Sequence, residues 1–126
     1  MPARLRPADP DEVAAAHARL DAGTEERGDL RLLVKHYLAL LEQQVPGRSV
    51  EVRVPPYAAV QVVPGVRHTR GTPPAVVELD ARTWLLLATG GLTWAEADDA
   101  GRVSASGQRA DLSAHLPVTG AGRAAG

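Results

Sequence analysis

Hydrophobic residues in the first third of the chain recur with the period of an α-helix. Within residues 24–47 the apolar positions are spaced by three and four residues, until Pro46 and Gly47 interrupt the pattern. These positions are Leu30, Leu33, Val34, Tyr37, Leu38, Leu41 and Val45. The spacing predicts the main amphipathic helix. Residues 9–23 predict a shorter, Ala-rich helix, with Asp9 as N-cap, Pro10 at the first helical position and Gly23 beyond the end.

The period then changes from 3.6 residues to two, which is typical of β-strands. In residues 49–56 the valines Val50, Val52 and Val54 alternate with charged residues, and Pro55-Pro56 ends the run. Residues 57–65 and 75–80 give two further short strands. The short break at the two prolines predicts antiparallel pairing of the first two strands, and the three together predict a meander.

Two short helices are expected next, because each is bounded by capping residues. Asp80 and Gly90 bracket the first, and Thr93 with Glu96 forms a capping box that opens the second. Residues 101–112 then predict a strand of small residues. Its two faces are Val103, Ala105 and Gly107 on one side and Ser104, Ser106 and Gln108 on the other. Residues 109–117 suggest a last helical turn.

This order of elements predicts an α+β fold, a mostly antiparallel sheet with helices packed on one face and an extra N-terminal helix. The length of 126 residues fits one domain of ordinary size. We divide it into an N-terminal helical extension (residues 1–24), the α+β domain (25–117) and a flexible C-terminal tail (118–126) rich in Gly and Ala.

Composition narrows the choice of partners and compartment. The formal net charge of −1 and the lack of a basic stripe argue against nucleic acid as a partner. The chain has no cysteine, no long apolar run and no signal peptide, so we expect a cytoplasmic protein without integral membrane association. Its basic residues are nearly all Arg, a usage typical of GC-rich bacteria.

Candidate catalytic chemistry is sparse. His17, His36, His68 and His115 are scattered, without the spacing of metal ligands, and no serine lies in a nucleophile-elbow context. We therefore expect no catalytic residue, no metal and no cofactor.

The loop RHTRGTPP, residues 67–74, concentrates polar side chains that include Arg67, His68 and Arg70. Two guanidinium groups beside hydroxyls can hold a carboxylate or phosphate. The same loop can instead be solvated, with its arginines paired to Glu51, Glu78 or Asp80, and the sequence leaves both readings open.

The small-residue strand raises a second question, because it fills little volume. Trp84 and Trp94 lie on the two short helices, which we expect to cover Val103, Ala105 and Gly107. Small residues opposite large ones suit either close helix-on-sheet packing or a cavity. Both alternatives stay open at this stage.

The segment LATGGLTWAEADDAGRVSASGQRADL, residues 87–112, together with the order of elements, resembles the sterol carrier protein family. In that fold a short helix ends in a Gly-x-Leu turn, here at Gly91 and Leu92. A second helix ends in Gly, here Gly101, and a strand bearing Gly, here Gly107, follows. The stretch SGQRADL and the closing Leu-Pro are also similar to the carrier-type C-terminal domain of actinobacterial maleylpyruvate isomerase relatives.

The resemblance implies binding of sterols, fatty acids or fatty acyl groups in a tunnel between sheet and helices. The catalytic domain of the isomerase relatives, with its metal-binding histidines, has no counterpart in this sequence. The resemblance therefore implies a binding role without catalysis.

We expect a non-enzymatic carrier of a hydrophobic small molecule. The expected lining residues are Val60, Val62, Trp84, Leu87, Trp94, Val103 and Ala105, with His68 and Arg70 as a polar mouth. The alternative is an interaction or accessory module of the same fold without a working tunnel, acting as a homodimer or docking an enzyme. A third hypothesis, an enzyme that uses the loop at 67–74 on an anionic substrate, predicts that Arg70→Ala destroys turnover without altering stability.

Overall fold

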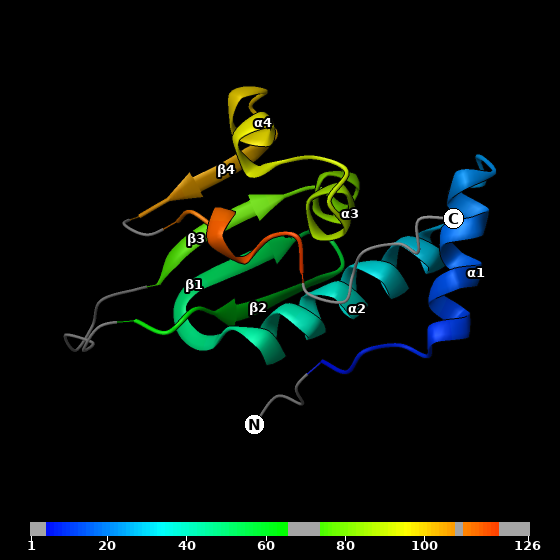
Figure 1. Cartoon of the computed structure of the whole chain (residues 1–126), viewed down its shortest axis with the longest axis horizontal. Helices are drawn as coiled ribbons and strands as arrows, with labels where there is room; N and C mark the ends of the chain where they lie inside the picture. Colours follow the sequence, from blue (N-terminus) through cyan, green and yellow to red (C-terminus); the bar gives the residue numbers. More distant parts are fainter. Residues whose placement is uncertain (1–4, 66–73, 108–109, 119–126) are drawn as a thin grey trace.

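Two N-terminal helices are followed by a four-stranded sheet whose last two strands are separated by two short helices (Figure 1). The computed structural model describes residues 5–65, 74–107 and 110–118. The elements are α1 (Pro10–Asp21), α2 (Arg27–Gln44), β1 (Pro46–Val54), β2 (Ala58–Val62), β3 (Ala75–Leu79), α3 (Ala81–Thr89), α4 (Trp94–Asp99), β4 (Val103–Ser106) and the 3₁₀ turn η1 (Ser113–His115).

The helix ends carry the capping residues that the sequence predicts. The Asp80 carboxylate accepts the Thr83 N–H at 2.8 Å, and Gly90 ends α3 with a φ of 89°. At α4, the Glu96 carboxylate accepts the Thr93 N–H at 2.9 Å and the Thr93 hydroxyl accepts the Glu96 N–H at 3.1 Å. These bonds satisfy N–H groups that have no partner within a helix, and they confirm where the two short helices begin.

The sheet is mixed, in the order β2-β1-β3-β4. β1 pairs with β2 antiparallel, as the sequence predicts, and β3 pairs with β4 antiparallel. The expected meander is wrong, because β3 lies on the other side of β1 and runs parallel to it, with Val52 opposite Val77. The physical reason is that alternation of apolar and polar residues determines which side chains of a strand face the core. It does not determine which other strand lies beside it.

The core lies between one face of the sheet and the helices, as expected. We call this face the inner face; it carries Val50, Val52 and Val54 of β1 and Val77 and Leu79 of β3, all buried. The opposite, outer face carries exposed polar residues, among them Arg53, Gln61, Glu78 and Ser104. Valine alternation along the strands thus separates a packed face from a solvated one.

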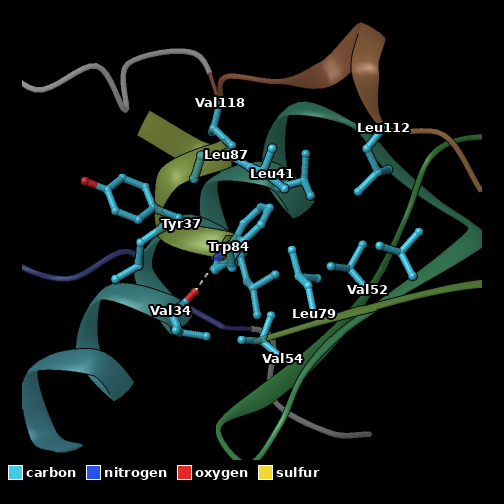
Figure 2. Packing of buried hydrophobic residues seen from close by; sticks show 14 of the residues in the cluster. Val34, Tyr37, Leu41, Val52, Val54, Leu79, Trp84, Leu87, Leu112 and Val118 are labelled. Atoms are coloured by element: carbon cyan, nitrogen blue, oxygen red, sulfur yellow. Dashed lines mark hydrogen bonds between the residues drawn. The ribbon is translucent and has the colours of Figure 1, made fainter. Parts of the chain in front are cut away.

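The C-terminal segment also packs into the core. Leu112, just before η1, is 1% exposed, and the Val118 N–H donates to the Ala88 carbonyl at 3.0 Å. Figure 2 shows Val118 beside Leu87, and Leu112 reaching into the cluster from a different direction. The predicted last helical turn is thus η1, and its flanks cover part of the inner face.

Candidate functional site

Strand β4 lies at one edge of the sheet, and its inner face is only partly covered. Val103 pairs with Leu79 and Ala105 pairs with Val77, so both side chains point to the inner face. Val103 is buried, but Ala105 is exposed although its neighbour Val77 is fully buried. The expectation that the helices cover Ala105 is therefore wrong, because the six-residue helix α4 makes few contacts with β4.

Gly107 follows β4 and is needed for close packing of the backbone. Its φ is +98°, and a Cβ at this position would lie 3.0 Å from Cα of Ala75. A side chain here would collide with β3 in a backbone conformation that already disfavours it. The small size of this residue therefore serves the approach of two strands rather than a ligand.

Trp84 and Leu87 of α3 are buried in the core. Trp84 has no exposed surface, and its indole N–H donates to the Val34 carbonyl of α2 at 3.3 Å. Figure 2 shows Leu41, Leu79 and Leu87 around the indole ring. In this arrangement both residues fill the space between the helices and the sheet.

Trp94 is the large residue of the expected lining that is only half-buried. It is the first residue of α4 and packs against the rim of the core. The capping box at Thr93 and Glu96 fixes the start of the helix and hence the place of Trp94. The hydrogen bonds from Thr93 lower the pKa of the Glu96 carboxyl, so the box is formed at neutral pH.

Val60 and Val62 of β2 share the inner face with the β4 residues but lie at the opposite edge of the sheet. Two strands separate them, which corresponds to roughly 14 Å at the usual strand spacing. Both valines are buried, opposite Val52 and Val50. The four strand residues of the expected lining thus share the inner face of the sheet without forming one local cluster. His68 and Arg70, the expected polar mouth, lie outside the described residues.

One polar contact near β4 is absent from the sequence-based expectations. The Arg102 Nε–H donates to the Thr83 hydroxyl at 3.0 Å, which ties the start of β4 to the first turn of α3. Thr83 is fully buried, so this bond satisfies a polar group inside the protein. No pattern in the sequence points to this pair, because the two residues belong to different elements.

Two hollows lined by described residues lie away from the expected lining. One, of about 140 Å³, lies among α1, α2 and α3 and is lined in part by His17, Leu20 and Leu85. The other, of about 330 Å³, is lined in part by Arg53, Tyr57 and Glu78, of which Arg53 and Glu78 are on the outer face. The first hollow is made by three helices, whereas the second is lined mainly by residues 53–59, with Glu78 of β3 beside them.

Residues 5–65, 74–107 and 110–118 contain no group of three or more His, Asp or Glu side chains placed to hold a metal ion. In the same residues no helix is both long and apolar enough to cross a lipid bilayer.

The fold and the half-covered inner face define the class of protein: a small α+β domain in which helices close one face of a sheet over an aliphatic core. The chain belongs to the family described as bacterial SCP ortholog, where SCP stands for sterol carrier protein, and the family model matches residues 26–118. This match confirms the resemblance seen in the sequence. No curated protein matches the chain. Membership of the family suggests a carrier role for a lipid or another hydrophobic ligand.

Proposed function

We propose that the protein binds a hydrophobic small molecule, such as a fatty acid, a fatty acyl group or a sterol-like lipid, without catalysing a reaction. The observation that carries the proposal is Ala105, which faces inward beside buried Val77 and is nevertheless exposed. A hydrophobic ligand would pack on this exposed apolar part of the inner face, where no side chain of the described residues covers it. Burial of its apolar surface would supply about 25 cal/mol per Å².

In this proposal the lining residues fall into two groups. Ala105 and Trp94 would touch the ligand directly, because Ala105 is exposed and Trp94 is half-buried. Val103 and the other four lining residues would touch it only if the helical layer moves away from the sheet, because they are buried; these four are Trp84, Leu87, Val60 and Val62. His68 and Arg70 would hold a carboxylate at the mouth. Residues 25–117 would form the binding domain, with residues 1–24 as an extension and 118–126 as a tail, whose first residue Val118 is packed in the core.

The test uses two substitutions on neighbouring residues of β4 that point to opposite faces of the sheet. Ala105→Trp would fill the proposed site and abolish binding of a fluorescent fatty acid, while the thermal midpoint changes little because the position is exposed. Ser104→Trp places the same side chain on the solvated outer face and should leave affinity unchanged. Equal affinity of Ala105→Trp and the unmodified protein would contradict the site.

The alternative function is an interaction module that keeps the fold without a working tunnel. It is favoured by the complete burial of Trp84 and Leu87, and by the edges of β2 and β4 that no described strand pairs with. Unpaired edges can add strands from another chain, either a second copy or an enzyme partner. A concentration-dependent dimer in analytical ultracentrifugation, combined with no fatty-acid binding, would favour this function.

A further inference from the structure

The segment that leads into α1 is attached to the side of α2 through a histidine. The Ala8 N–H donates to Nδ1 of His36 at 2.9 Å, across 28 residues of sequence. Leu5, at the start of the same segment, is half-buried and packs against the core. Figure 1 shows the segment passing close to α2 before the chain turns into α1. We call residues 5–8 the N-terminal strap.

The bond at Ala8 exists only while Nδ1 of His36 carries no proton. A neutral imidazole has one nitrogen that accepts, whereas both nitrogens of the protonated ring carry hydrogen. Protonation would therefore place an N–H of the ring against the N–H of Ala8. Burial lowers the pKa of His36 below its usual 6.5, which agrees with a neutral ring in the attached state.

The lowered pKa of His36 is caused by burial and not by the charged groups nearby. On α2 the ring follows Lys35 and packs edge-on against the Tyr37 ring, with centroids 4.8 Å apart. On the strap side, Arg6 and Asp9 flank Ala8, and the Asp9 carboxylate accepts the Asp11 N–H at 3.1 Å as the cap of α1. Burial is the cause of the shift in the pKa of His36, ahead of any nearby charge.

Two further polar contacts join α1 to α2, and neither needs an unprotonated histidine as acceptor. His17 Nε2 lies 2.6 Å from the Tyr37 hydroxyl, and a protonated His17 can still donate to that oxygen. Arg19 binds Asp29 through two hydrogen bonds, of 2.7 and 2.8 Å, and lowers the pKa of the Asp29 carboxyl below 3.8. Protonation of His36 therefore removes the acceptor at Ala8, while these two contacts between α1 and α2 keep a donor and an acceptor.

We propose that the N-terminal strap is an acid-released element, which is attached to α2 while His36 is neutral and detaches when the ring is protonated, with α1 staying in place. This inference does not depend on the proposed carrier function. The sign follows from the direction of the pKa shift: attachment is at full strength above 6.5 and weakens as the pH falls below it. The loss is about tenfold per pH unit until the pKa of the attached state is reached.

The test is a titration of the full chain by ¹⁵N NMR, from about pH 7.5 to about pH 4.5. The Ala8 amide and the His36 ring should titrate with the same midpoint, below 6.5. The hydrogen-exchange protection of Ala8, corrected for intrinsic exchange, should fall about tenfold per pH unit over the same range. Amides of α1 should keep their protection.

Two variants separate His36 from the other histidines. His36→Asn supplies an acceptor near the position of Nδ1 that does not titrate, so the Ala8 amide should stay protected in acid. His17→Gln should leave the transition in place. The proposal is overturned if Ala8 fails to titrate with His36, if the His36 ring stays neutral down to about pH 4.5, or if His36→Asn still releases the strap.

Discussion

Trp84 is the residue that joins the two helical elements over the sheet. Its indole fills the space between α2 and α3, and the indole N–H donates to the Val34 carbonyl of α2. Tryptophan is suited to this place because it combines the largest apolar surface with a single polar group that must find an acceptor. Among the fully buried side chains of the described residues, Trp84 is the largest.

Replacing Trp84 by alanine should therefore destabilise the fold strongly. The expected loss is about 3–5 kcal/mol in the free energy of unfolding, because the substitution leaves a cavity that aliphatic neighbours cannot fill. Urea denaturation followed by circular dichroism measures it. Trp94→Ala is the matched control, and it should cost clearly less because Trp94 is half-buried. Equal losses for the two variants would contradict the assignment of Trp84 to the core.

At the scale of elements, the docking of α1 on α2 combines apolar packing with polar contacts. Ala16 is the buried residue of α1, and Val13 and Leu20 are partly buried against the core. The pair of Arg19 and Asp29 supplements this packing, and the Asp29 side chain is only 8% exposed. Paired geometry with two hydrogen bonds makes this contact stronger than an ordinary surface ion pair.

Asp29→Asn should loosen α1 in a pH-dependent manner. The pKa of Asp29 is lowered in the folded state, so its contribution is present above 3.8 and is lost as the pH falls through the lowered value. The thermal midpoint of the variant should therefore lie below that of the unmodified protein at neutral pH, and the two should converge in strong acid.

Glu25→Gln is the control for this substitution, because Glu25 and Arg82 form a pair in which both side chains are about half exposed. Such exposed pairs contribute little to stability. If Glu25→Gln and Asp29→Asn lower the thermal midpoint equally, the Arg19–Asp29 pair has no special role in holding α1.

At the scale of the whole molecule, the sequence predicts the elements well because their signals are local. The sequence correctly predicts that Asp80 and Thr93 cap the two short helices and that Gly90 ends α3. The neighbour of β3 could not be predicted in this way, because a valine alternation suits a parallel or an antiparallel partner equally.

The candidate site is less predictable from sequence than the fold. The alternation in β4 gives the correct face for Ala105, through its pairing with Val77. Whether something covers that face depends on the length and place of α4 and of the segment around Leu112, which are properties of packing. The histidine contact at Ala8 depends likewise on two segments that meet only in the folded chain.

The measurement that tests the central claim most directly is lipid analysis of the protein purified from its own host. The protein is denatured, and the organic extract is compared by mass spectrometry with an extract of a matched blank. The proposed function predicts a fatty acid, an isoprenoid or a sterol-like species in stoichiometric amount. An empty extract, followed by no binding of a fluorescent fatty acid to the refolded protein, would contradict a carrier role and favour the interaction module.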